Sequence, residues 1–196
     1  MPAYTLAPGF RIGPLMHRRN LLSAIDRYAT RYPEESRVVA RFKALLQSHE
    51  DCFERDCLPG HITGSAWLVC PKRQNVLLTH HRKLNMWLQL GGHSDGEGNT
   101  PAVAIREAHE ESGLAVHLLD NEIFDLDVHE IPARETYPAH HHFDVRYQMR
   151  ASSEKFQISE ESLDLAWVKI EELEQYTEEE SILRMRRKWY KSNNSS

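Results

Sequence analysis

The sequence is poor in cysteine and contains no long apolar run. Its 196 residues include 3 cysteines, Cys52, Cys57 and Cys70, which cannot all pair within one chain, and no Cys-x-x-Cys motif occurs. This usage argues against a small secreted domain held together by disulfides. No stretch has the length and apolar character of a membrane span, and residues 1–13 lack a signal-peptide pattern. We therefore expect a cytoplasmic protein without membrane contact.

A standard zinc-binding pattern is also missing. Cys52, Cys57 and His61 lie near one another in the sequence, but their spacing matches no usual arrangement of zinc ligands. We expect these cysteines to be buried and inert.

The chain has no excess of positive charge. It carries 24 Lys and Arg against 29 Asp and Glu, which gives a net charge of -5 at pH 7. A protein that binds a nucleic-acid polymer needs a basic surface to neutralise phosphates, so we expect no such partner. A small nucleotide carried with a divalent cation is compatible with this charge. Hydrophobic residues make up 40% and charged residues 27%, as in ordinary globular domains.

The most informative feature that is present is a cluster of acids at the end of a predicted helix. Thr100 as the N-cap and Gly113 as the C′ residue predict the limits of this helix. The clustered acids are Glu107, Glu110 and Glu111. They lie on one side of the helix and at its negative pole, where cations are stabilising and anions are not. The cluster therefore indicates either a solvated acidic surface or a divalent cation with oxygen ligands.

The segment that contains these acids resembles the Nudix box, Gly-x5-Glu-x7-Arg-Glu-hydrophobic-x-Glu-Glu-x-Gly-hydrophobic. The second half of the pattern, from Arg106 to Leu114, matches at every fixed position. The first half departs from it. Gly92 aligns with the opening glycine, Gly98 stands where a glutamate is expected, and Glu97 comes one residue early. Either the loop replaces this glutamate or it carries a one-residue shift.

The resemblance implies a fold and a chemistry. The fold class is α/β, a Nudix-like α/β/α sandwich with a mixed central sheet, to which this chain adds an N-terminal helical extension. Nudix pyrophosphohydrolases use Mg²⁺ or Mn²⁺ and water to hydrolyse the diphosphate linkage of small molecules such as nucleotide sugars and dinucleotides. Divalent cations suit this reaction because they screen phosphate charge and stabilise the leaving oxygen.

The resemblance also assigns roles to residues of this chain. The metal ligands are Glu107, Glu110, Glu111 and the backbone carbonyl of Gly92. Arg106 orients a glutamate. Glu161, in a late loop, is a candidate general base, and one of the three helical glutamates is the alternative.

The residues before and after the box suggest three parts. We expect an N-terminal helical extension at 1–58, a Nudix domain at 59–190 and a flexible tail at 191–196. Two apolar stripes at helical spacing predict an antiparallel helix pair in the extension. The stripes are Leu21, Leu22, Ile25, Tyr28, Ala29 and Tyr32, then Val38, Val39, Phe42, Leu45 and Leu46. The pair can pack on the domain, form a homodimer interface or cover the substrate.

Two polar clusters outside the box are candidates for substrate binding. Arg82 and Lys83 follow a short predicted strand and either contact substrate phosphates or form an ordinary exposed turn. A predicted hairpin of residues 125–131 and 139–147 brings His129, His140 and His142 together. We assign His140 and His142 to substrate contact, while a second metal site and a hydrated sheet face remain open alternatives.

Two alternative functions come from other classes. A non-catalytic nucleotide sensor with this fold would not need to keep the glutamates. An isomerase of the isopentenyl diphosphate type would need a catalytic cysteine near the metal loop, and none of the three cysteines is placed there in sequence.

Overall fold

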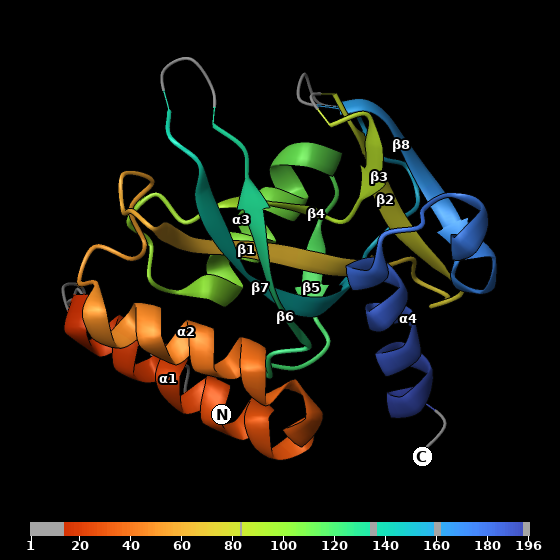
Figure 1. The fold of residues 1–196 in the computed structure, drawn as a ribbon. Helices are drawn as coiled ribbons and strands as arrows, with labels where there is room; N and C mark the ends of the chain where they lie inside the picture. The colour runs from red at the N-terminus through yellow and green to blue at the C-terminus, as the bar shows by residue number, and fades with distance from the viewer. Residues whose placement is uncertain (1–13, 83, 134–136, 159–161, 194–196) are drawn as a thin grey trace, which may run out of the picture.

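The computed structural model describes residues 14–82, 84–133, 137–158 and 162–193. Figure 1 shows helices arranged around a curved central sheet. The helical segments are α1 (Pro14–Arg31), η1 (Pro33–Glu35), α2 (Ser36–Ser48), α3 (Thr100–Ser112), η2 (Ile170–Gln175) and α4 (Glu180–Asn193). The strands are β1 (Gly60–Val69), β2 (Asn75–His81), β3 (Met86–Leu88), β4 (Leu90–His93), β5 (Val116–Leu118), β6 (Asp125–Ile131), β7 (His140–Ala151) and β8 (Ser162–Lys169).

The sheet is mixed, and its longest pairing joins strands that are far apart in sequence. The order β3-β2-β1-β7-β5 is extended by β4 on β1, β6 on β7 and β8 on β2. β1 runs parallel to β7 along its whole length, from Gly60 beside His141 to Val69 beside Arg150. The other described pairings are antiparallel. Every residue of β1 is buried, as expected for a central strand covered on both faces.

Alternation along β1 and β7 divides the helices into two layers, because successive side chains point to opposite faces of a sheet. On one face, α3 approaches Gly64, and Phe42 of α2 makes an edge contact with Phe143, at 5.3 Å between ring centroids. On the other face, Trp67 packs against Trp189 of α4. This arrangement confirms the expected sandwich with a mixed central sheet.

The N-terminal helix pair packs on the domain. α1 and α2 lie side by side along one face of the sheet (Figure 1). Their buried residues share one hydrophobic cluster with β1, α3 and β7. Both predicted stripes contribute, with Leu21, Ile25 and Tyr28 buried in α1 and Phe42 and Leu46 buried in α2. The pair therefore completes the core on that side.

Local details around the box differ from the sequence-based expectation. Gly91 and Gly92 lie inside β4, so the loop before α3 begins only after His93. The N-cap of α3 is Asn99, whose side chain accepts a hydrogen bond from the Ala102 N–H at 3.5 Å. The expectation that Thr100 caps the helix is therefore wrong by one residue.

A network of buried charges joins the edge strand β6 to β7 and α4. The carboxylate of Asp125 accepts hydrogen bonds from Arg146 at 3.1 Å, from Arg184 at 2.7 Å and from Lys188 at 2.6 Å. Arg146 is also bonded to Asp144 at 2.7 Å. Burial by itself lowers the pKa of Arg146, but the neighbouring carboxylates outweigh it and raise the pKa above its usual range. Arg146 therefore stays charged although it is buried.

The burial of the cysteines agrees with the compositional expectation. Cys52, Cys57 and Cys70 are buried and unpaired. Burial raises the pKa of Cys52 and of Cys57 to about 12. None of the described helices has the length and apolar character that crossing a membrane requires.

Candidate active site

Helix α3 carries the three glutamates, and Gly113 fixes its end. Gly113 has φ 68° and donates its backbone N–H to the His109 carbonyl at 2.7 Å, so the predicted C′ role is confirmed. Glu107 and Glu111 are largely buried against the sheet, whereas 57% of the Glu110 side chain is exposed. The helix therefore presents two glutamates inward and one toward solvent.

Strand β4 lies directly against these carboxylates. The Gly91 N–H donates a hydrogen bond to Oε1 of Glu111 at 2.8 Å. A Cβ added at Gly92 would overlap the carboxylate of Glu107. A side chain at position 92 would therefore displace the Glu107 carboxylate, because the backbone of β4 and the acids of α3 share one small region.

The donor set of this region fits a hard divalent cation. Carboxylate and carbonyl oxygens are the ligands that Mg²⁺ prefers, and Mg²⁺ usually keeps several waters as well. The side chains of Glu107, Glu110 and Glu111 and the carbonyl of Gly92 would supply such oxygens.

Arg106 connects the helix to the end of β4. Its guanidinium donates a hydrogen bond to the His93 carbonyl at 2.7 Å. The same group lies 2.9 Å from Glu107 and 3.8 Å from Glu110. Arg106 is thus in position to orient Glu107.

The structure explains the departure in the first half of the box. Gly98 is buried, and a Cβ at this position would overlap Cβ and Cγ of His17 in α1. A glutamate at 98 therefore cannot coexist with the N-terminal helix in this position. Glu97 is exposed and accepts a hydrogen bond from the Asn99 N–H at 2.7 Å. In this structure Glu97 supports the turn before α3.

We predict that Gly98→Ala will destabilise the protein by about 1–3 kcal/mol, the usual cost of overpacking. The new methyl group would overlap His17, whose Cβ is not a flexible chain end. Urea unfolding should be measured for Gly98→Ala, His17→Gly and the double variant. In the His17→Gly background, Gly98→Ala should cost less by at least about 1 kcal/mol. An equal cost in both backgrounds would contradict the proposed contact.

Five histidines gather on one face of the sheet, on β1, β4, β6 and β7. The predicted hairpin is present, with His129 paired to His142 and Ile131 to His140. The ring of His61 lies 5.0 Å from that of His140 and 4.9 Å from that of His142. His93 lies 4.9 Å and His129 5.5 Å from His142, all between ring centroids.

Burial keeps the central rings neutral. Desolvation, aided by nearby histidines, lowers the pKa of His142 to about 2. Desolvation and His140 lower the pKa of His61 to about 4, and the Cys57 backbone partly opposes this shift. Desolvation, with Arg55 and His61, lowers the pKa of His93 to about 4.

His61 and His93 were not predicted as members of this cluster with His140 and His142. His93 pairs with Thr63 across the β1–β4 ladder, and His61 reaches the cluster because β1 lies beside β7. A parallel pairing between distant strands leaves no local signal in the sequence. Cys57 instead lies with His49 and Asp51, so Cys52, Cys57 and His61 do not form one group within the described residues.

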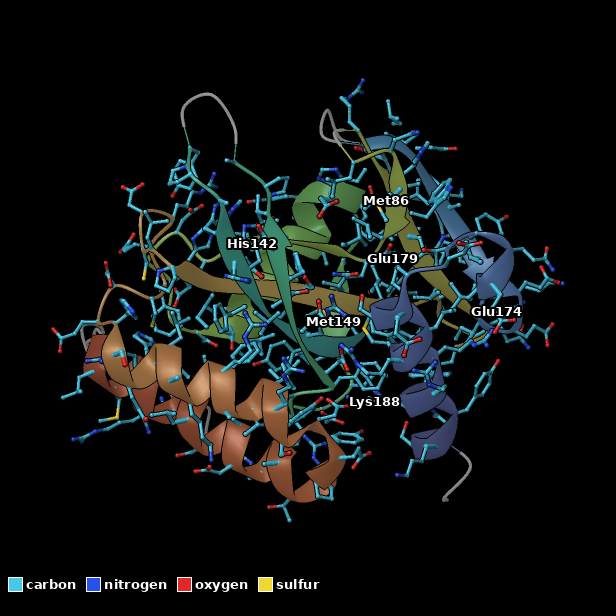
Figure 2. The ribbon with its side chains drawn as sticks, viewed as in Figure 1. Met86, His142, Met149, Glu174, Glu179 and Lys188 are labelled. Carbon is cyan, nitrogen blue, oxygen red and sulfur yellow. The ribbon has the colours of Figure 1, made fainter. Side chains whose placement is uncertain are left out.

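The candidate substrate-binding residues and the candidate base Glu161 are not all among the described residues. Arg82 is exposed in the turn between β2 and β3. Lys83 and Glu161 lie outside the described residues. His140 is buried, and His142 is partly exposed and labelled on the hairpin in Figure 2.

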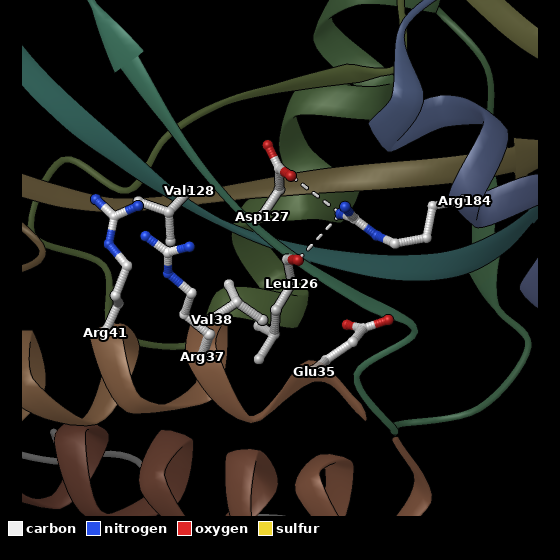
Figure 3. Close-up of a pocket in the computed structure, with 8 residues that line it drawn as sticks. All are labelled: Glu35, Arg37, Val38, Arg41, Leu126, Asp127, Val128 and Arg184. Atoms are coloured by element: carbon white, nitrogen blue, oxygen red, sulfur yellow. Dashed lines mark hydrogen bonds and ion pairs between the residues drawn. The ribbon is translucent and has the colours of Figure 1, made fainter. Parts of the chain in front are cut away.

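A pocket of about 320 Å³ lies between α2 and the edge strand β6, and Figure 3 shows its lining. Arg37 and Arg41 rise from α2 beside Val128, and Arg184 bonds to Asp127 on the opposite side. No glutamate of the box lines this pocket. It is a gap between the helix pair and the sheet and is separate from the carboxylate site.

Comparison with known proteins identifies the family. The sequence matches the family described as NUDIX domain over residues 61–189. A Nudix-family hydrolase from Clostridium perfringens is 28% identical, with a TM-score of 0.51, covering 65% of this chain and 95% of that chain. No protein with a curated description matches this sequence.

Two further structures share the fold. The MutT protein from Methanosarcina mazei Go1 has a TM-score of 0.54 at 17% identity, covering 69% of this chain and 95% of that chain. An Ap4A hydrolase from C. elegans has a TM-score of 0.50 at 14% identity, covering 69% and 98%.

The chain belongs to the Nudix family and is a Nudix-type pyrophosphohydrolase. The family match and the independently described fold agree on the same region, from β1 to α4.

Proposed function

We propose that the protein hydrolyses the diphosphate linkage of a small nucleoside-diphosphate-type molecule with bound Mg²⁺ or Mn²⁺. Glu107, Glu110, Glu111 and the Gly92 carbonyl hold the metal. The observation that carries this proposal is the close packing of the two glycines of β4 on the carboxylates of α3, because it gathers hard oxygen donors beside a backbone strand.

Each residue of the carboxylate site has a separate role in the proposed reaction. Glu107 and Glu111 are oriented by Arg106 and by the Gly91 N–H, so their oxygens are held before substrate arrives. Bound divalent cations screen the diphosphate and stabilise the leaving oxygen. A carboxylate accepts the proton of the attacking water as the bond between phosphorus and the bridging oxygen breaks. This base is one of the three glutamates or Glu161.

The alternatives fit this chain less well. An isomerase would need a reactive cysteine, whereas the described thiols are buried and the pKa of Cys52 and of Cys57 is raised to about 12. A nucleotide sensor would have no use for three acids at the negative pole of a helix.

The test is a turnover assay on nucleotide sugars, dinucleotides and ADP-ribose with Mg²⁺ or Mn²⁺, measuring phosphate-containing products. We expect hydrolysis of at least one class and its loss when EDTA removes the metal. Tight nucleotide binding without metal, together with no turnover on the whole panel, would instead identify a sensor.

A further inference from the structure

Three histidines at the start of β1 and β7 converge without satisfying their ring nitrogens internally. His61 is only 1% exposed, yet neither of its nitrogens is in hydrogen-bonding geometry with a partner, although the Cys57 backbone lies nearby. Nε2 of His142 is also buried without a partner. A buried polar atom without a hydrogen-bond partner is unfavourable, because it has lost its bonds to water and gained none in return. A ligand that accepts lone pairs would remove that cost.

We propose that His61, His140 and His142 form a second metal site, which binds a transition ion of the Zn²⁺ class. One ligand nitrogen from each ring lies within 4.8 Å of the others. In a tetrahedral site with bonds of about 2.0–2.1 Å, the ligand atoms lie roughly 3.4 Å apart. Closing the site therefore requires each pair of ligand nitrogens to approach by no more than about 1.4 Å, the difference between these two separations.

The backbone holds these rings in place. His61 is the direct neighbour of His142 in the parallel ladder, and His140 lies two residues earlier on the same face of β7. Two strands at the centre of a sheet are rigid elements, and precise metal sites are built on such elements.

The hydrogen bonding of His140 also suits a ligand. Its Nδ1 lies 3.0 Å from the Pro138 carbonyl oxygen, and this carbonyl can only accept, so Nδ1 carries the proton. In the neutral ring of this tautomer, Nε2 is the nitrogen that carries the lone pair. Metal-bound histidines usually donate their other N–H to a carbonyl or carboxylate in this way.

The ligand chemistry separates this site from the carboxylate site. Three neutral imidazoles suit Zn²⁺ and similar transition ions, whereas Mg²⁺ prefers oxygen. His93 and His129 pack around the ring of His142 and close the site at its sides. The site is independent of diphosphate hydrolysis, and it gives His140 and His142 a role as ligands in place of direct substrate contact.

The test is Zn²⁺ binding to the full chain in excess Mg²⁺, which saturates the carboxylate site. We expect one tightly bound Zn²⁺ per chain by metal analysis after dialysis. Loss of an outer-shell partner typically weakens metal binding by about 10–100-fold. Loss of a direct ligand should weaken Zn²⁺ binding by more than this in each of three variants, His61→Gln, His140→Gln and His142→Gln. His117→Gln is the matched control, since His117 is exposed on β5 and bonded to Ser152. This control should bind as the unmodified protein does.

Thermal unfolding of the same proteins shows whether each variant is folded, so that lost Zn²⁺ binding is not confused with lost structure. Zn²⁺ should raise the Tm of the unmodified protein and of Glu110→Gln, but not that of the folded histidine variants. Glu110→Gln separates the two proposals, because this variant should lose hydrolysis but still bind Zn²⁺. Zn²⁺ binding and hydrolysis can therefore each be contradicted without the other.

Three results would overturn the proposal. The first is equal Zn²⁺ affinity in the unmodified protein and the histidine variants. The second is a sulfur-to-metal charge-transfer band with Co²⁺ that Cys57→Ser removes, which would place the ion at His49, Asp51 and Cys57. The third is absence of tight Zn²⁺ binding to the unmodified protein. Loss of substrate affinity in His142→Gln would then show that the cluster contacts the substrate.

Discussion

Replacing Glu110 by glutamine is expected to lower kcat for diphosphate hydrolysis by on the order of 10²–10³-fold, as loss of one transition-state stabilising group does. Glutamine keeps the size of the side chain but removes one negative charge from the cation site. Since 57% of the Glu110 side chain is exposed and its ion pair with Arg106 is long, at 3.8 Å, the fold should be unaffected. Turnover and metal dependence of the purified variant provide the measurement.

The matched control is Glu174→Gln. This residue is similarly exposed, at 64%, and pairs with Arg186 away from the box. The same chemical change there should leave kcat within about twofold, because surface substitutions have small effects. If Glu110→Gln retained full activity, the assignment of Glu110 as a metal ligand would be wrong.

Asp125→Asn is expected to destabilise the protein by about 3–5 kcal/mol, because removal of one partner from a buried ion pair leaves uncompensated charge. Asp125 is 0% exposed and bonds to Arg146, Arg184 and Lys188. These cations come from β7 and α4, so the change weakens the attachment of the last helix to the sheet. The free energy of unfolding in urea measures the effect.

Asp26→Asn makes the same substitution in an exposed ion pair. Asp26 lies 2.5 Å from Lys43 with 64% of its side chain exposed. Exposed pairs contribute at most about 1 kcal/mol, so the change should be small. Equal effects of the two substitutions would show that Asp125 and its partners do not stabilise the fold.

Local patterns in the sequence predicted several of the elements and the helix that carries the three glutamates. The helix ending at Gly113 and the hairpin that carries His129 and His142 follow from spacing and periodicity over a few residues. The second half of the Nudix box, long and specific, indicated the family that the comparison confirms. These features are encoded by neighbours in sequence, which is why they could be predicted.

Contacts between distant segments could not be predicted. Nothing near Gly98 indicates that His17 occupies the adjacent space, and nothing near His61 indicates its neighbours on β7. The contact of His17 with Gly98 and the contacts of His61 with β7 depend on how whole helices and strands pack together. The sequence of a single segment does not determine that packing. The Nudix motif located three carboxylates on one helix, and their role as metal ligands stays a prediction. The reason for the missing glutamate at position 98 came only from the fold.

The parallel pairing of β1 with β7 affects the order in which the chain can fold during synthesis. Thr63 and Asp144, which share a hydrogen bond across these strands, are 81 positions apart. A ribosome adds roughly 5–20 residues per second, so β1 emerges several seconds before its partner. During that interval the apolar faces of α1 and α2 lack the β7 surface they finally cover, and they are candidates for chaperone binding. A metal ion held jointly by His61 and His142 could load only after β7 has joined the sheet.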